Sequence, residues 1–225
     1  MATVLVTGGA GGLGAAVVGA AAKQGWQPCV VDRRAPADGV SWVECDLADT
    51  RAAERATRLL ADRHGGLDAV VTAAGVDVPG ALAGVPAVVW ERVIAVDLLA
   101  TAAVVRAALP DLVRARGAVV TVASTLGLRA VGDATAYCAA KFGVVGFTRA
   151  LAAELAGTVR VTLLAPGGMR TGFFDDRDER YRPPPGAALN DPASVAGAVM
   201  FALNQPPGCA VRELVVCPER ESSYP

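Results

Sequence analysis

The sequence predicts an α/β protein with a doubly wound, seven-stranded, mainly parallel sheet that carries helices on both faces. Short β-branched runs alternate with longer Ala- and Leu-rich segments along the whole chain, which is typical of this class. Each short run is apolar almost throughout, as expected of strands that are buried on both faces. A glycine-rich turn follows the first run and opens the first helix, which is the arrangement of Rossmann folds.

The strands are predicted, in chain order, at residues 3–7, 27–32, 41–46, 69–73, 118–123, 159–165 and 213–217. A first helix follows the glycine turn, and further helices are predicted at 51–63, 90–114, 137–155 and 193–204. Asp49 or Thr50 caps the helix at 51–63, because short polar side chains favour this position. Asp191 caps the last helix, with Pro192 in its first turn.

The whole chain, residues 1–225, is predicted to form a single domain, since α/β domains of this length are common. The irregular segment at about 167–190 contains Phe173 and Phe174, a run of mixed charges and three consecutive prolines. This composition predicts a short lid over a binding site rather than a linker between domains.

Composition narrows the class of partner. Apolar residues make up 53% of the chain and the net charge is −1, which excludes disorder and favours neither nucleic acid nor an anionic membrane. Asp97 and Arg106 interrupt the apolar stretch around residues 100–105, so no transmembrane helix is expected. The N-terminus leaves no room for a signal peptide, which predicts a cytoplasmic protein. With a single histidine and no Cys or His pair at ligand spacing, no metal is expected, and the partner is a small molecule.

The glycine-rich turn runs from Thr7 to Gly14. Backbone amides at the helix that follows would face a pyrophosphate with no Cβ atoms in the way, so the turn predicts a dinucleotide site. Two glycine registers fit equally: Gly9, Gly11 and Gly14 in the general spacing, or Gly8, Gly12 and Gly14 after a threonine. The turn by itself does not choose between them.

Asp32 closes the second strand and favours NAD as the cofactor, with NADP less favoured. Its carboxylate would accept hydrogen bonds from the adenosine ribose hydroxyls and repel a 2′-phosphate. Arg33 and Arg34 follow directly, and either lie on the adenine, reach a 2′-phosphate or face solvent. Asp46 ends the third strand, where it would reach the adenine amino group, cap the following turn with Leu47, or do both.

Tyr137 and Lys141 lie four residues apart in a predicted helix, which puts both side chains on one face. A free phenol has a pKa of about 10 and is a poor base at neutral pH, but a nearby ammonium stabilises the phenolate. This pair therefore predicts an acid–base tyrosine, and the same lysine would donate to a bound ribose. Ser124 ends the fifth strand at the edge where open α/β sheets bind ligands, and its hydroxyl would hold a substrate oxygen.

These motifs together resemble the short-chain dehydrogenase/reductase family, over residues 4 to about 171. The resemblance rests on the Thr7, Gly8, Gly12 and Gly14 register, Asp32, the spacing of Ser124, Tyr137 and Lys141, and Pro166-Gly167 followed by Thr171. It implies hydride transfer at a secondary alcohol or ketone, with Tyr137 as general acid/base. Ser124 would orient the carbonyl, and Lys141 would lower the pKa of Tyr137 and hold the ribose.

The resulting site has two groups of residues. The catalytic group is Ser124, Tyr137, Lys141 and Asp97. The cofactor-binding group is Thr7, Gly8, Gly12, Leu13, Gly14, Asp32, Arg33, Asp46, Leu47, Ala74, Gly75, Tyr137, Lys141, Pro166, Gly167 and Thr171.

Two departures from the family pattern stand out. The family's Asn-Asn-Ala-Gly after the fourth strand is Thr72-Ala73-Ala74-Gly75 here, which keeps only the two residues that let the backbone approach the cofactor. The family usually has an asparagine where this chain has Asp97. If the main-chain carbonyl of residue 97 is the group that takes part in catalysis, aspartate can replace asparagine without loss of activity. If the carboxylate points inward, it would pair with Lys141 and alter the pKa of Tyr137.

The substrate is predicted to be an apolar or alicyclic small molecule, because the candidate pocket residues are mostly apolar. They are Val76, Val78, Pro79, Leu126, Leu128, Val131, Met169, Phe173 and Phe174. Helices 90–114 and 137–155 carry apolar residues on more than one face, which predicts a homotetramer or homodimer. Two other functions remain open: a non-redox lyase or isomerase, and a non-catalytic dinucleotide-binding module on the same fold.

Overall fold

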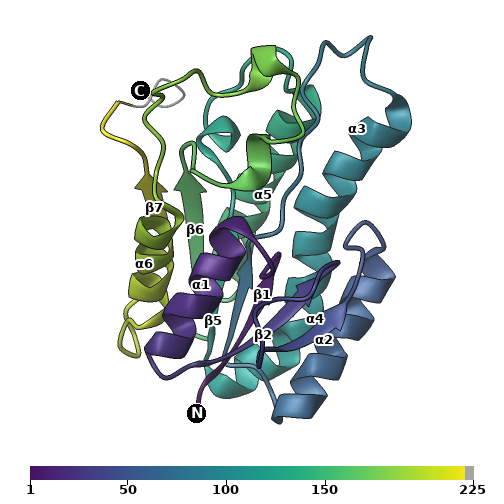
Figure 1. Cartoon of the computed structure of the whole chain (residues 1–225). Coiled ribbons are helices and arrows are strands. Elements are labelled where there is room, and N and C mark those ends of the chain that lie inside the picture. The colour runs from purple at the N-terminus through teal and green to yellow at the C-terminus, as the bar shows by residue number, and fades with distance from the viewer. Residues whose placement is uncertain (221–225) are drawn as a thin grey trace.

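The computed structural model of the chain describes residues 1–220 (Figure 1). Its strands are β1 (Thr3–Thr7), β2 (Gln27–Asp32), β3 (Ser41–Glu44), β4 (Ala69–Thr72), β5 (Ala118–Val122), β6 (Arg160–Pro166) and β7 (Glu213–Val216). Its α-helices are α1 (Gly12–Lys23), α2 (Thr50–His64), α3 (Ala87–Ile94), α4 (Ala100–Ala115), α5 (Thr135–Glu154) and α6 (Pro192–Leu203).

The seven strands form one sheet in the order β3-β2-β1-β4-β5-β6-β7, and every neighbouring pair is parallel. Helices α1 and α6 pack together on one face, while α2, α4 and α5 cover the other (Figure 1). Separate apolar clusters fill the two layers. The predicted doubly wound Rossmann fold is confirmed. The strand order reverses between β1 and β4, which is where such sheets bind ligands.

Most predicted boundaries agree with the structure to within two residues, and the longest helix differs most. Its first turn begins at Ala87, three residues before the predicted start at Trp90. Between α3 and α4 the helix widens into a π-helical turn, η1 (Ala95–Leu99), whose second and third residues are buried. Such turns are rare and are frequent at functional sites. This one carries Asp97, and sequence periodicity gives no sign of it.

Residues 87–115 form one continuous helical stretch that is long and apolar enough to cross a bilayer, by length and composition alone. Asp97 and Arg106 do not keep the stretch from meeting this criterion, but a single helix of this kind is weak evidence for a membrane span. Half of the most apolar window is buried inside the fold, as in the core helices of globular domains. The stretch packs against α2 and α5 through its apolar residues.

The lid at 167–190 is joined to the fold at both ends. Met169 pairs with Asn190 in a short parallel bridge, and the Asn190 side-chain amide donates to the Val216 carbonyl at 2.8 Å. Two short 3₁₀ turns lie within it, η3 (Gly172–Phe174) and η4 (Glu179–Tyr181). Near its middle, the Tyr181 hydroxyl donates to Asp133 at 2.9 Å. The lid is thus held against the carboxyl edge of the sheet.

Candidate active site

The glycine turn folds back on itself so tightly that side chains are excluded. A Cβ on Gly14 would lie 2.1 Å from the Gly8 carbonyl oxygen, and a Cβ on Gly8 would lie 2.8 Å from Ala74 Cα. Gly8 also has a φ of +71°, a conformation that favours glycine. The turn therefore needs glycine at the first and last positions of the Gly8, Gly12, Gly14 register.

The start of α1 fits an anionic group. Gly11 occupies the N-cap position of α1 and provides no side chain to cap it, so the first amides of the helix have no side-chain acceptor. Helix N-termini of this kind bind phosphates through those amides and the helix dipole. Thr171 lies beside the turn, with its methyl carbon 3.5 Å from the position of a Cβ on Gly12. These residues fit the pyrophosphate of a dinucleotide, and Leu13 is buried beneath them.

The Asp32 carboxylate, which was expected to bind the ribose, also accepts a hydrogen bond from the glycine turn. One carboxylate oxygen accepts from the Ala10 amide and the other from the Arg34 amide, each at 3.0 Å. The Arg34 guanidinium also reaches the turn, with one Nη atom 3.0 Å from the position of a Cβ on Gly11. Arg33 was expected in the cofactor group, yet Arg34 is the arginine whose guanidinium lies against the turn.

Asp46 takes part in two interactions that the sequence only half predicted. It accepts from the Ala48 amide at 3.0 Å, as a turn-capping residue does, and from Arg92 of α3 at 2.9 Å. Burial raises the pKa of Asp46, but the Ala48 amide, Arg92 and Arg33 together lower it more, so it lies below its ordinary value. Leu47 is buried in the core beneath this turn. Asp46 is therefore tied to α3 through Arg92.

The ends of β1, β4 and β6 meet around the glycine turn. The Thr7 hydroxyl accepts from the Ala74 amide at 3.2 Å, which joins the first strand to the residues after β4. Pro166 closes β6, and the Gly167 amide donates to the Val216 carbonyl at 2.9 Å. Thr171 caps η3 by accepting from the Phe173 amide at 3.3 Å. These residues line the edge at which a nicotinamide ring would lie.

Ser124, Tyr137 and Lys141 come together as predicted. Ser124 follows β5, and its hydroxyl is hydrogen-bonded to Tyr137 and accepts from the Leu126 amide at 3.1 Å. Tyr137 and Lys141 lie in the first two turns of α5, with Lys141 Nζ 5.4 Å from the centre of the tyrosine ring. Lys141 is almost completely buried and donates to the Val122 carbonyl at 3.1 Å.

Asp97 points inward and pairs with Lys141. The distance from Lys141 Nζ to Asp97 Oδ2 is 3.1 Å, and both side chains are buried. The other carboxylate oxygen accepts from the Val76 amide at 2.8 Å. A Cβ on Gly75 would lie 3.1 Å from Asp97 Oδ2, so Gly75 makes room for this ion pair as well as for a cofactor. Of the two alternatives for Asp97, the structure has the inward carboxylate.

The pKa of Tyr137 is raised from its ordinary value rather than lowered. Burial raises it most, while the Lys141 ammonium lowers it, and Asp97 raises it again. Burial also lowers the pKa of Lys141, but its acidic neighbours raise it more, so the lysine stays charged. The lysine thus acts on the tyrosine in the expected direction, but the expected net lowering is absent because the site is buried and holds more than one carboxylate.

A second buried ion pair lies beside the tyrosine and was missed by sequence analysis. Arg177 of the lid contacts Asp77, with an Nη atom 2.9 Å from Oδ2, and the two side chains are 12% and 5% exposed. The arginine lies 4.7 Å from the ring centres of Phe173 and Phe174, and the Phe173 ring is 5.8 Å from that of Tyr137. Burial raises the pKa of Asp77 to about 6, although Arg177 opposes this.

This pair left no clear signal in the sequence. Asp77 lies two residues after Gly75 without belonging to a motif, and Arg177 is hidden in a run of alternating charges. Asp77 Oδ1 and Arg177 Nε are both buried without a hydrogen-bond partner. Each such atom costs about 1–3 kcal/mol, so they mark a strained or functional position.

The predicted apolar pocket is formed only in part. Phe173 lies against Tyr137, as a pocket wall would. Val76, Leu128 and Met169 instead pack against core clusters, while Val78 and Val131 are exposed. The lid side of the site therefore combines the apolar Phe173 ring with the charged pair Arg177 and Asp77.

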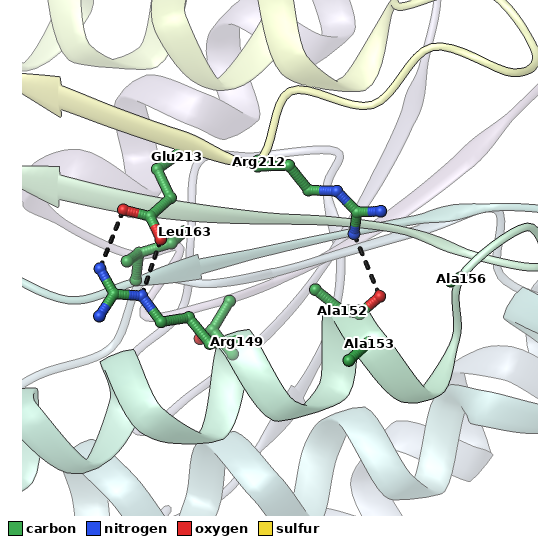
Figure 2. A pocket seen from close by; sticks show the side chains of 8 residues that line it. Arg149, Ala152, Ala153, Ala156, Leu163, Arg212 and Glu213 are labelled. Carbon is green, nitrogen blue, oxygen red and sulfur yellow. Dashed lines mark hydrogen bonds and ion pairs between the residues drawn. The ribbon is translucent and has the colours of Figure 1, made fainter.

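A cavity of about 360 Å³ lies elsewhere, between α5, β6 and β7 (Figure 2). Arg149 makes a paired contact with Glu213 there, and Arg212 donates to the Ala152 carbonyl at 3.1 Å. These polar groups are already partnered, and none of the predicted site residues lines the cavity. Within residues 1–220 no cluster of His, Cys, Asp and Glu fits a metal ion.

Comparison with known proteins identifies the family. A family model described as short chain dehydrogenase matches residues 2–182. The chain belongs to the short-chain dehydrogenase family. This short-chain dehydrogenase is accordingly an oxidoreductase with a nicotinamide dinucleotide as its cofactor.

Its relatives include enzymes of several names. The 3-oxoacyl-(acyl-carrier-protein) reductase MabA of Mycobacterium tuberculosis is 31% identical over 207 residues, which are 88% of this chain and 84% of MabA. The glycine betaine reductase ATRR of Emericella nidulans is 31% identical over 236 residues, 96% of this chain. The match covers only 19% of ATRR, so this dehydrogenase corresponds to about a fifth of that protein.

Solved structures share the whole architecture. A 3-ketoacyl-(acyl-carrier-protein) reductase from Brucella melitensis, complexed with NADH, superposes with a TM-score of 0.86 at 26% identity. The match covers 97% of this chain and 98% of the reductase. The seven-stranded sheet and its helices are therefore those of the family.

Proposed function

We propose that this short-chain dehydrogenase interconverts a secondary alcohol and a ketone, with NAD preferred over NADP and Tyr137 as general acid/base. The observation that carries the proposal is the meeting of Ser124, Tyr137 and Lys141, with Lys141 Nζ beside Gly75 after β4. A non-catalytic dinucleotide-binding module would have no need for these three side chains. The chain from 1 to 225 would act as one NAD(P)-binding domain.

The cofactor would be held by the glycine turn, the first amides of α1 and Asp32, with Thr171, Pro166 and Gly167 on the nicotinamide side. When bound, a nicotinamide dinucleotide supplies or accepts the hydride. Lys141 Nζ has three N–H groups, of which one donates to the Val122 carbonyl, and the ammonium is also ion-paired with Asp97. At least one N–H group remains to donate to a ribose hydroxyl. Asp32 would accept from the adenosine ribose, and its charge is the reason to expect NAD.

The proton would pass through Tyr137. In ketone reduction its hydroxyl donates a proton to the developing alkoxide, and in alcohol oxidation the phenolate accepts one. Ser124 would donate a hydrogen bond to the same substrate oxygen and hold it near the tyrosine. The buried Lys141 ammonium stabilises the phenolate, and the Asp97 carboxylate keeps the ammonium charged and in place.

We expect an alicyclic or otherwise largely apolar substrate, because the rings of Phe173 and Phe174 lie on the lid side of Tyr137. We also expect a homotetramer or homodimer. Several large apolar side chains are exposed along α3, η1, α4 and α5, and a contiguous patch of such side chains is typical of a subunit interface. The exposed side chains are Val88, Leu99, Val113 and Phe142. Size-exclusion chromatography that gives a monomer would contradict this assembly.

Replacing Tyr137 by phenylalanine tests the function directly. We expect turnover of secondary alcohols with NAD to fall by about 10²- to 10⁴-fold, because the general acid/base is lost while the fold is kept. Absorbance of the reduced nicotinamide measures the rate across a panel of alcohols and ketones, and fluorescence titration measures NADH binding. Tyr181→Phe, in the lid, is the matched control and should keep most of the turnover.

Unchanged turnover in Tyr137→Phe would overturn the acid–base role. Tight NADH binding by the wild type, without net redox change on any alcohol or ketone, would favour a lyase, an isomerase or a binding module instead.

A further inference from the structure

We propose that Asp77 and Arg177 form a recognition site for a second hydroxyl group of the substrate, beside the carbon that reacts. The substrate class is then a neutral vicinal diol or hydroxyketone rather than a simple alcohol. This inference deepens the proposed function and depends on it for the identity of the reacting carbon.

The pair occupies the substrate side of the site. Asp77 follows β4 and Arg177 lies in the lid, so the two come from segments 100 residues apart that meet over the carboxyl edge of the sheet. The Phe173 ring contacts both the Tyr137 ring and the Arg177 guanidinium, and so lies between them. The charges of Asp77 and Arg177 both interact with Tyr137. A substrate held on Tyr137 would therefore lie next to the pair.

The hydrogen-bonding capacity of the pair is incomplete. Asp77 Oδ2 and one Nη atom of Arg177 satisfy each other at 2.9 Å, but Asp77 Oδ1 and Arg177 Nε are buried without partners. One of these atoms accepts and the other donates. A hydroxyl both donates and accepts, whereas a carbonyl or carboxylate only accepts and an ammonium only donates. A neutral hydroxyl can therefore complete both atoms, whereas a carboxylate or an ammonium cannot.

The charges favour a neutral ligand. Two buried carboxylates, Asp77 and Asp97, face two buried cations, Lys141 and Arg177, and each carboxylate is already paired with one cation. An anionic substrate would have to displace Asp77 from Arg177 and would then face its carboxylate. A neutral hydroxyl can join the pair without separating it, while the two phenylalanine rings contact the carbon skeleton.

The first test compares two alcohols of similar shape, trans-1,2-cyclohexanediol and trans-2-methylcyclohexanol, with the purified chain and saturating NAD. We expect kcat/KM to favour the diol by at least about 10-fold in the wild type, because the methyl group leaves the polar atoms unpaired. In the double variant Asp77→Leu/Arg177→Met the preference should disappear. The matched control is Asp178→Leu/Arg180→Met, an exposed acid–arginine pair in the same lid, which should keep the preference.

A binding measurement separates this inference from the proposed function. In Tyr137→Phe loaded with NAD, calorimetry should show tighter binding of the diol than of the methyl alcohol, by about the same factor. Equal binding, or binding of neither, overturns the hydroxyl site even if the wild type oxidises alcohols. Preferential diol binding without turnover by the wild type supports the hydroxyl site and overturns the proposed function. A wild-type enzyme that oxidises both alcohols equally also overturns the site.

Discussion

The cofactor half and the substrate half of the site consist of different kinds of groups. The cofactor half consists mainly of backbone atoms and glycines at the ends of β1 and β4, with closest approaches that leave no space for a Cβ. The substrate half consists of two buried ion pairs, Lys141 with Asp97 and Arg177 with Asp77. Shape controls the first half and charge the second. Substitutions should therefore change binding geometry in one half and protonation in the other.

The largest effect is expected from Gly14→Ala in the cofactor half. The added methyl group would lie 2.1 Å from the Gly8 carbonyl oxygen, so the turn has to move. We expect NADH affinity, measured by fluorescence titration, to fall by about 100-fold or more, since roughly 3 kcal/mol of contact is lost. The control is Gly19→Ala in the same helix, where nothing lies within 4 Å of the new Cβ. Equal effects of the two variants would contradict the comparison.

Asp97→Asn tests the substrate half by removing a buried charge with little change of shape. Because the Asp97 carboxylate raises the pKa of Tyr137, its loss should lower that pKa. Tyr137 and Asp77 still raise the pKa of Lys141 in this variant, so we expect the lysine to keep its charge. The pH profile of alcohol oxidation should then move to lower pH by about one unit. Asp111→Asn, at the other end of the same long helix, serves as control. An unchanged profile in Asp97→Asn would reject any role for its charge.

Asp32→Asn removes a charge from the cofactor half and so tests whether charge also matters there. We expect the ratio of NADPH to NADH affinity to rise by about 10-fold, because repulsion of a 2′-phosphate is removed and Arg34 remains beside the turn. Titrations with both nucleotides measure the ratio. Asp38→Asn, exposed in the following loop, should leave it unchanged. NADPH binding tighter than NADH in the wild type would contradict the NAD preference itself.

Asp77→Asn should give the smallest effect, visible as a change in the pH dependence of stability. The pKa of Asp77 is raised from 3.8 to about 6, so between these values the folded chain holds a proton that the unfolded chain has lost. The free energy of unfolding of the wild type should therefore decrease, relative to Asp77→Asn, as the pH rises from about 4 to 6. Urea denaturation at several pH values measures this difference. A relative increase over the same range would show that Arg177 dominates the pKa of Asp77.

The cofactor half could be predicted from the sequence more fully than the substrate half. The strands and the shared face of Tyr137 and Lys141 could be inferred from spacing along the chain. The register Gly8, Gly12 and Gly14 and the pairing of Ser124 with Tyr137 followed from the resemblance to the family. The π-helical turn at Asp97 and the pairing of Arg177 with Asp77 could not. The first depends on how one helix packs against α5, and the second joins residues 100 positions apart.

The sequence by itself determined the fold class, the dinucleotide turn and the facing of Tyr137 and Lys141. Local backbone geometry encodes these features: periodicities of two and 3.6 residues set which side chains share a face, and glycine sets where the chain can turn tightly. Only the tertiary structure decided that Asp97 points inward, that the pKa of Tyr137 is raised, and that the lid places Arg177 against Asp77. These depend on burial and on distances between remote residues, because the strength of a charge interaction follows from how far water is excluded from it.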